Sequence, residues 1–455
     1  NLGEIARLAS SLQGLCLYYE MRVRYPEGEQ ACQAGLSALP DNLAEAEILR
    51  ARLLLWRASF LALSGELEAA RSLRQQASAL LDQLEAQNAE VRRPRAMYWQ
   101  AEGEAQADLK LKLEYYQRGI ALYQQLGDDW RQAGMLVWAG EYAMRLGDPS
   151  LALSLQQQAV RLARANGEPG ILLHCLRQST YLFLMTAQSE KAGQLMQEAA
   201  LVAESVAELP LRANAQMHLG MQLVHCGRIP EAIRALEQSV PVLRSLGYRY
   251  GMVYGTNALG YACVLNGEYE RGKAILQAAL LEAEQGGFLR EATVVIGSLG
   301  MIALALGQHD QACEHFHEMV GRYRRMQFAG ELSMALGGLA LAQIAAGQIE
   351  AAQLNLLEAL PIAEKTHNMA ALLLCLPALV HLFARRGQLQ TALLVHRLTL
   401  LHPMLQASRW YSDILGEQMT AHWQALPPEQ QAAIEAEAQP HNIFSIIPQV
   451  LALFK

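Results

Sequence analysis

The chain has 455 residues, of which 52% are apolar and only 7% aromatic, and its formal net charge is −7. This much apolar material can bury a large core. The charges are spread along the chain without a block of Lys and Arg, so we expect no nucleic-acid partner and no membrane partner.

The seven cysteines are scattered and form no Cys-x-x-Cys motif. This usage is typical of a reducing compartment, so we expect a cytoplasmic location. The longest apolar run, Met369–Phe383, contains Pro377 and is shorter than the roughly 20 residues that span a bilayer.

The first part of the chain, residues 1–106, has a divergent helical pattern with turn residues at Pro26 and Gly65. Because the chain opens at Asn1 inside a helical pattern, we expect it to be a piece of a longer protein. The segment Glu85–Arg95 interrupts the pattern and carries three arginines. It is predicted to be a solvated loop, or alternatively a contact with a further domain.

Residues 107–401 repeat with a period of 40 residues. The turn inside each helical pair falls on a small residue, at Gly147, Ala187, Gly227, Gly267, Gly307, Gly347 and Gly387. The turn between successive pairs keeps the same period, at Gly127, Gly167, Ala207, Gly247 and Gly287. Two turns per period leave about 17 residues for each helix, a length within the usual range for globular proteins. Glycine suits these turns because it reaches positive φ without steric cost.

Small residues also recur inside the helices. Gly220, Gly260 and Gly300 each follow a leucine in the first helix of a pair, and alanines such as Ala352 and Ala359 recur in the second. Residues at these spacings share one helix face, so neighbouring helices can approach closely. The sequence therefore predicts an all-α fold, a right-handed solenoid of about ten helix-turn-helix repeats.

After Leu401 the repeat stops, and residues 402–455 are predicted to form capping helices. Ser408–Leu426 is predicted to be one helix, ended by Pro427-Pro428, with shorter helices at about 428–437 and 442–454. The last open face of a solenoid needs such a cap. The alternative is a docking surface formed by Trp410, Trp423 and Phe444.

This pattern resembles the tetratricopeptide repeat over about residues 5–400, most clearly from Ala133 to Gln390. The Leu-Gly pairs of the first helix, the turn glycines and the two alanines of the second helix match that family. The period of 40 residues exceeds the family's usual 34, which lengthens the helices.

The longer period, the repeat number and Leu126-Gly127-Asp128 are similar to the sensor arm of bacterial STAND-class signalling ATPases and maltose-regulon-type transcription activators. The resemblance implies a module that binds a small molecule or peptide inducer and relieves the autoinhibition of an NTPase domain upstream of Asn1. The alternative is a repeat scaffold that holds an extended peptide of a partner protein without switching.

No motif predicts an enzyme, a cofactor or a metal in this chain. Gly267-x-x-x-x-Gly272-Lys273 imitates a phosphate-binding loop, but Ala274 stands where Mg²⁺ needs Ser or Thr. His315 and His317 are two residues apart, so on a helix they point in different directions and cannot share one ion. No nucleophilic triad is apparent.

Ligand-binding residues are expected on the inner face of the first helices, where helical solenoids usually bind their partners. In the last repeats these inward positions are apolar or small, whereas in four middle repeats they turn aromatic, amide and charged. The predicted ligand-binding residues are Trp138, Glu141, His174, Arg177, Gln178, Tyr181, Asn214, Met217, His218, Met221, Tyr254, Asn257 and Tyr261.

These side chains cost free energy to desolvate unless a partner binds them. Arg177 would pair with an anionic group, Asn214 and Asn257 would bond a backbone or hydroxyl group, and Tyr181 and Tyr254 would stack on the ligand, as would Tyr261 and Trp138. The alternative is a wet groove without a ligand, with polar pairs such as Glu141–Arg177 satisfying each other.

Overall fold

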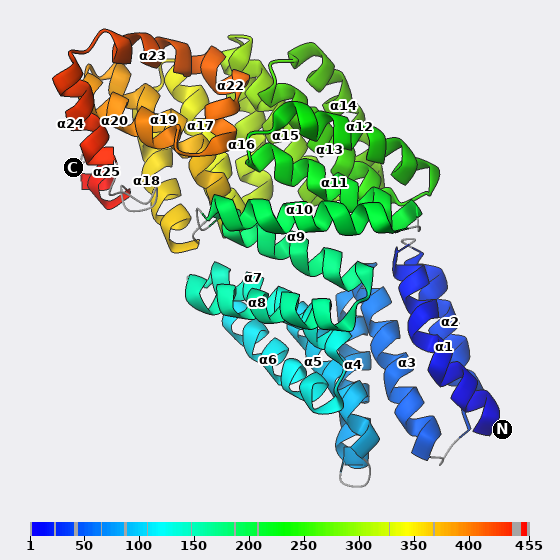
Figure 1. Cartoon of the computed structure of the whole chain (residues 1–455). Coiled ribbons are helices and arrows are strands. Elements are labelled where there is room, and N and C mark those ends of the chain that lie inside the picture. Colours follow the sequence, from blue (N-terminus) through cyan, green and yellow to red (C-terminus); the bar gives the residue numbers. More distant parts are fainter. Residues whose placement is uncertain are drawn as a thin grey trace. The chain divides into compact units, whose positions relative to one another are not determined.

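The structure is a computed structural model, and it is helical throughout the residues that it describes (Figure 1). These residues are 2–21, 24–40, 44–64, 66–85, 89–106, 108–146, 148–185, 188–206, 209–326, 328–366, 369–438 and 447–452. The chain divides into two compact units, which are described separately. One comprises Asn1–Leu182 with Leu246–Arg249, and the other Phe183–Ser245 with Tyr250–Lys455.

The first unit contains the N-terminal helices. They are α1 (Leu2–Met21), α2 (Tyr25–Ala38), α3 (Ala44–Leu63), α4 (Leu67–Glu85), the 3₁₀ turn η1 (Ala89–Val91), α5 (Arg92–Ala105), α6 (Leu109–Leu126), α7 (Asp129–Arg145), α8 (Pro149–Asn166) and most of α9 (Pro169–Met185).

The second unit contains the later repeats and the C-terminal helices. The repeat helices are α10 (Ser189–Ser205), α11 (Leu209–His225), α12 (Ile229–Ser245), α13 (Arg249–Leu265), α14 (Tyr269–Gly286), α15 (Leu289–Ala305), α16 (His309–Met326), α17 (Ala329–Ala345), α18 (Ile349–Thr366), α19 (Met369–Arg385) and α20 (Leu389–Thr399). The C-terminal helices are α21 (Pro403–Ala407), α22 (Arg409–Tyr411), the π-helical η2 (Ser412–Gly416), α23 (Glu417–Gln424), α24 (Pro428–Ala438) and α25 (Ile447–Ala452).

Helices α1 to α20 alternate as first and second helices of ten helix-turn-helix repeats. Partners such as α7 and α8, α11 and α12, and α17 and α18 pack along each other. The predicted all-α solenoid of tetratricopeptide type is therefore confirmed. The division at residues 106 and 401 was drawn from the regularity of the repeat, and it stays a prediction.

The turn glycines have the conformation that the repeat predicts. Gly227 and Gly267, inside two pairs, have φ of 74° and 82°, and Gly127 and Gly247, between pairs, have φ of 61° and 67°. Each ends a helix in the left-handed region that side chains disfavour. The predicted turn residues Gly65, Gly147, Ala187 and Ala207 lie outside the described residues.

Close helix packing inside each pair depends on the glycine of the first helix. A methyl group at Gly260 would lie 2.6 Å from Leu276 Cγ, and one at Gly220 would lie 2.6 Å from Leu236 Cγ. The register is the same in both pairs. Bulky side chains of the second helix fill the space that each glycine leaves, which fixes how the two helices cross.

The prediction of a solvated loop at Glu85–Arg95 is wrong for its second half. Helix α5 begins at Arg92, and Pro94 lies in its first turn, a position that proline tolerates because the first N–H groups of a helix have no partner. Arg95 is buried with its Nη2 atom 2.5 Å from Asp82 Oδ1, and Arg93 pairs with Asp128. The arginines bind their own unit.

The predicted C-terminal helices are present, and the helix predicted at Ser408–Leu426 is observed as an uninterrupted helical segment, Arg409–Gln424, with a π-helical section at Ser412–Gly416. Helix α24 packs on α20 and α25 packs on α18. The segment His402–Gly416, which we call the C-terminal strap, consists of α21, α22 and η2. Trp410 is fully buried, so it cannot form the alternative docking surface. Trp423 lies beside Arg397, whose guanidinium carbon is 4.8 Å from the indole centroid, and Phe444 lies outside the described residues.

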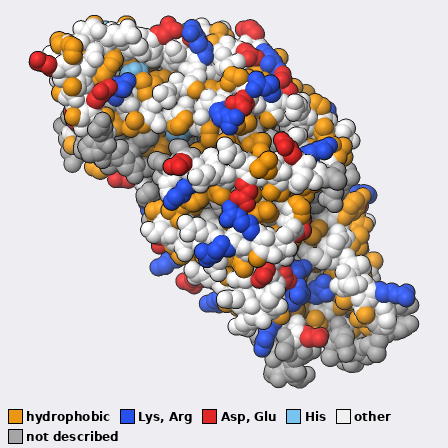
Figure 2. All heavy atoms as spheres, viewed as in Figure 1, with side chains coloured by type: hydrophobic (Ala, Val, Ile, Leu, Met, Phe, Trp, Pro, Cys, Tyr) orange, Lys and Arg blue, Asp and Glu red, His pale blue; other side chains and the backbone are white. Residues whose placement is uncertain are grey.

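Charged side chains of both signs are interspersed on the face shown in Figure 2, where neither sign gathers into a patch. Among the described residues, none of the helices combines the length and the apolar character needed to cross a membrane.

Candidate functional site

The first unit carries six of the predicted ligand residues, on α7 and α9. Trp138 and Tyr181 are 37% and 44% exposed, which is unusual for large aromatic side chains and leaves both accessible to a ligand. The Trp138 ring centroid is 6.0 Å from that of His174, and Arg177 Nη2 is 3.2 Å from His174 Nδ1. Trp138, His174 and Arg177 thus form one cluster, with Gln178 next to Arg177 in sequence.

Burial keeps the His174 imidazole neutral. Together with the positive charge of Arg177, burial lowers the pKa of His174 to about 3. A neutral imidazole can accept a hydrogen bond from the Arg177 guanidinium through Nδ1, which orients the guanidinium.

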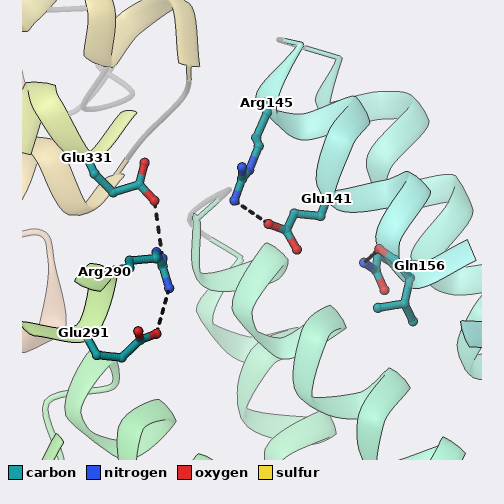
Figure 3. A network of polar contacts seen from close by, with 7 residues as sticks. Glu141, Arg145, Gln156, Arg290, Glu291 and Glu331 are labelled. Atoms are coloured by element: carbon teal, nitrogen blue, oxygen red, sulfur yellow. Dashed lines mark hydrogen bonds and ion pairs between the residues drawn. The ribbon is translucent and has the colours of Figure 1, made fainter. Parts of the chain in front are cut away.

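Glu141 pairs with a residue other than the one suggested by the sequence. Its Oε1 atom lies 2.6 Å from Nη2 of Arg145, one turn along the same helix (Figure 3). The alternative pair Glu141–Arg177 is therefore replaced by a pair within α7. Because both carboxylate and guanidinium are partly exposed, the pair contributes little stability and could be opened by a ligand.

A buried amide links the helices behind this cluster. Gln156 Nε2 donates to the Val137 carbonyl at 3.0 Å, and Ser179 Oγ donates to Gln156 Oε1 at 3.1 Å. Gln156 on α8 therefore joins α7 to α9 and holds the helices that carry Trp138 and Arg177. It is labelled in Figure 3.

The second unit carries the other predicted residues, on α11 and α13. We call the surface formed by α11, α13 and α15 the first-helix surface. The rings of His218 and Tyr254 lie on it in tilted contact, with centroids 5.4 Å apart. The row continues through Tyr250, 6.1 Å from Tyr254, to Phe288, 6.0 Å from Tyr250. Tyr250 and Phe288 were not predicted, because they lie at the starts of helices, outside the inward positions of the repeat.

One predicted residue, Met217, is buried by helix packing. Met217 is 0% exposed, and a methyl group at Gly255 on the next first helix would lie 3.2 Å from its sulfur. Gly337 lies at the register of Met217 in a later repeat, and a methyl group there would lie 2.6 Å from the sulfur of Cys375 on the next first helix. Positions ten residues before the turn therefore serve contact between successive first helices. Met217 supports the surface from behind.

Two amide oxygens on this surface lack partners. Asn257 is only 6% exposed, and neither its Oδ1 atom nor that of Asn214 has a hydrogen-bond partner among the described residues. A buried acceptor without a donor costs about 1–3 kcal/mol. Each oxygen has less than 1 Å² of accessible surface, so an N–H donor of a ligand would reach it once a neighbouring side chain moves.

Tyr261 and Met221 lie nearer the turns inside the pairs. The C-terminal strap reaches Tyr261, whose hydroxyl is 3.6 Å from Met404 Sδ. Burial raises the pKa of Tyr261, so the phenol stays protonated. A ligand can contact Tyr261 only where the strap leaves it accessible.

Arg290, at the start of α15, adds a charge to this unit that the sequence analysis did not single out. Its guanidinium lies 3.3 Å from Glu331 and 3.9 Å from Glu291 (Figure 3). Burial opposes its charge, but the two carboxylates outweigh burial and raise the pKa of Arg290. Its charge is therefore already matched by Glu331 and Glu291.

A half-open pocket of about 230 Å³ lies elsewhere in the second unit. It is lined by Leu184, Gly193, Met196, Gln197, Cys226, Arg228 and Pro403. None of the predicted ligand residues lines it. The described residues also contain no group of three or more His, Cys, Asp or Glu side chains placed to hold a metal ion.

No protein-family model and no curated protein matches this sequence. Among solved structures, the chain is similar to a Rap protein in complex with competence and sporulation factor. The identity is 15%, the match covers 80% of this chain and 99% of that one, and the TM-score is 0.55. It is also similar to the apo form of the quorum sensor NprR from B. thuringiensis, with 13% identity, coverage of 80% and 99%, and a TM-score of 0.50.

The chain also matches a STAND protein with a tetratricopeptide repeat sensor from Pyrococcus horikoshii. This match has 13% identity, covers 84% of this chain and 55% of that one, and has a TM-score of 0.40. At sequence identities this low, the matches show a shared fold alone, and that fold is the tetratricopeptide-type solenoid.

Proposed function

We propose that this tetratricopeptide-type solenoid binds a short peptide on the first-helix surface of its second unit. The observation that carries the proposal is a pair of buried amide oxygens without a partner among the described residues, Asn214 Oδ1 and Asn257 Oδ1. They lie on adjacent repeats, on the helices that bring His218 and Tyr254 into ring contact. Amide oxygens accept hydrogen bonds from backbone N–H groups, and a peptide offers such donors at regular spacing.

The aromatic row supplies the second element of recognition. Tyr250, Tyr254 and Phe288 form a continuous series of ring contacts next to the amides. Aromatic side chains give large contact areas at low cost in conformational entropy, and they are frequent at binding hot spots. The similar Rap protein was solved with competence and sporulation factor bound to it. We extend ligand binding on this fold to the present chain as part of the proposal.

A library of displayed random peptides, selected on the immobilised full chain, tests the proposal. A selected peptide would be synthesised and its Kd measured by isothermal titration calorimetry. We expect Asn214→Ala and Tyr254→Ala each to weaken binding about tenfold, equivalent to about 1.4 kcal/mol.

The matched control is Asn355→Ala. Asn355 lies on α18, the second helix of its pair, where its Nδ2 atom donates a hydrogen bond to Gln343 Oε1 at 2.7 Å. This variant should bind the peptide as the unaltered chain does. Equal affinity of the Asn214→Ala and Tyr254→Ala variants for every selected peptide would refute the site.

The cluster of the first unit is a separate part of the proposal. Arg177 would pair with an anionic group of a ligand, while Trp138 and Tyr181 would stack on it. An Arg177→Gln variant should lose affinity for peptides that carry a carboxylate and keep affinity for their amidated counterparts.

The finer form of the proposal follows the sequence resemblance. In it, the module is the sensor of a STAND-type signalling ATPase, and ligand binding releases an NTPase domain that precedes Asn1 in the parent protein. A ligand can shift such an equilibrium only by its difference in affinity for the two states. Small-angle scattering of the full chain with and without a selected peptide separates this sensor, whose profile changes, from a scaffold that binds without switching.

A further inference from the structure

The C-terminal strap lies on the repeats of the second unit much as a bound peptide would. At the α11/α12 turn, the position of a methyl group on Gly227 would be 2.5 Å from the Pro403 carbonyl oxygen and 3.2 Å from Ala407 Cβ. The strap therefore begins in direct contact with a turn that precedes it by several repeats.

The next pair, α13/α14, holds the strap at three points. Tyr261 hydroxyl meets Met404 Sδ at 3.6 Å, and Tyr269 hydroxyl donates to Asp413 at 2.6 Å. A methyl group at Gly267 would lie 2.7 Å from Arg409 Cγ. A hydroxyl-to-sulfur hydrogen bond, a hydroxyl-to-carboxylate hydrogen bond and the close approach of the Arg409 side chain to Gly267 thus act on one repeat.

The third repeat provides the anchor. Trp410 is fully buried, and its Nε1 atom donates to the Met301 carbonyl oxygen of α15 at 2.8 Å. Met301 and Tyr261 each lie six residues before the turn glycine of their pair. The strap therefore contacts one register in successive repeats, which is how an extended ligand engages a repeat array.

The strap also has the composition of a bound peptide. The side chain of Arg409 is 59% exposed and pairs with Asp413. The buried side chains of the strap are His402, Met404, Leu405, Ser408, Trp410, Tyr411 and Leu415. Peptide interfaces commonly place a few apolar anchors in a groove behind a polar rim. Helix α21 of the strap has only five residues, too few to be stable without the repeats that it contacts, whereas α22 and η2 continue into α23.

We propose that the strap is an internal ligand, and that the turn-side half of the first-helix surface recognises peptides of the same chemistry. Such a peptide carries a tryptophan anchor with an arginine directly before it and an acidic residue three positions after it, as in Arg409, Trp410 and Asp413. This inference rests on the proposed function in one respect, that the first-helix surface receives peptides. The strap then competes with them and keeps the site closed in their absence.

A tethered segment competes at an effective concentration in the millimolar range. A peptide with the strap's own sequence should therefore fail to displace the intact strap and should bind once the strap's anchor is removed. The strap peptide itself is the probe.

The test uses the full chain and a fluorescein-labelled synthetic peptide of residues 400–418, with fluorescence anisotropy as readout. The unaltered chain should not bind the peptide at 50 micromolar, roughly the concentration at which a tethered competitor still dominates. The Trp410→Ala variant should bind it at least tenfold more tightly, and a peptide carrying the same Trp→Ala change should not bind.

The matched control is Trp423→Ala, a tryptophan that lies beside Arg397 and outside the strap. This variant should behave as the unaltered chain does.

A Trp410→Ala variant that is folded by circular dichroism and does not bind the peptide would overturn the proposal. If that variant does not fold, hydrogen exchange of the unaltered chain decides. Amides of Met404–Tyr411 should exchange at least tenfold faster than those of Ala258–Cys263, because the strap opens without the repeats. Equal exchange rates in the two segments would show that the strap opens only when the repeats unfold, and would refute the proposal. Failure of the random-peptide selection, in contrast, would count against the proposed function and leave this result intact.

Discussion

Gly227 and Pro403 approach so closely that a methyl group at Gly227 would lie 2.5 Å from the Pro403 carbonyl oxygen. Gly227 also has a φ of 74°, which disfavours any side chain. We expect Gly227→Ala to lower the free energy of unfolding by about 3 kcal/mol or more, because strain in the turn adds to a clash with backbone. Urea denaturation measures the change.

Gly307 is the matched control for that substitution. Its φ is 71°, and a methyl group there meets nothing within 4 Å. Gly307→Ala should therefore cost only the backbone term, about 1–2 kcal/mol. Equal losses in the two variants would show that the strap does not rest on Gly227.

Acid should loosen the strap through His402. Burial, together with the nearby His225, lowers the pKa of His402 to about 4, and burial lowers the pKa of His225 to about 4. Above pH 6.5 both imidazoles are neutral whether the chain is folded or unfolded. Between pH 6.5 and about 4 the unfolded chain binds protons that the folded chain excludes, so stability falls by up to about 1.4 kcal/mol per pH unit for each group.

Urea denaturation at pH 7 and pH 5 checks this expectation. Other buried histidines contribute in the same direction, since His381 and His396 also have a pKa lowered to about 4 by burial. The comparison is therefore with His402→Gln, which should show a smaller loss of stability on acidification. An unchanged pH dependence in that variant would remove His402 from the explanation.

Gln156 should be important for stability in the first unit. Replacing it with leucine leaves the Val137 carbonyl and the Ser179 hydroxyl without this partner, which should cost about 1–3 kcal/mol. Gln157, the exposed neighbour on the same helix, is the control, and Gln157→Leu should change stability by less than about 0.5 kcal/mol. Similar losses in both variants would contradict the role assigned to the buried amide.

Cys16 and Cys32 should form a disulfide when the chain is treated with diamide. Their sulfur atoms are 3.9 Å apart between α1 and α2, and both side chains are buried. Each thiol loses one hydrogen to diamide, which is reduced to the hydrazine. A loop of this length predicts a gain of up to about 3 kcal/mol in stability. Non-reducing peptide mapping detects the bridge, and Cys16→Ser should prevent both the bridge and the gain.

The architecture could be predicted from the sequence because its determinants are local and periodic. Gly267 and Gly287 recur where a helix must end, and both adopt the positive φ that their position predicts. Gly260 recurs where two helices cross. Each of these requirements concerns residues within one repeat, so a fixed spacing in the chain reports them directly.

The candidate site was only partly predictable, because inward positions have two uses. Asn257 and Met217 occupy a register that also packs successive first helices together, and the structure buries both. The contact of Trp410 with Met301 joins residues 109 positions apart and has no periodic signal. Arg95 was assigned to a loop because Glu85–Arg95 interrupts the repeat, whereas a helix already begins at Arg92, with Pro94 in its first turn.

The strap should change both the mechanical resistance and the unfolding cooperativity of the second unit. In an open repeat array each unit contacts only its neighbours, so the array can unzip from either end. Contacts from Pro403 to Gly227 and from Trp410 to Met301 tie the end of the chain to repeats well before it. When force is applied at the C-terminus, this unit should stay folded until the strap detaches. The repeats should then unfold one at a time.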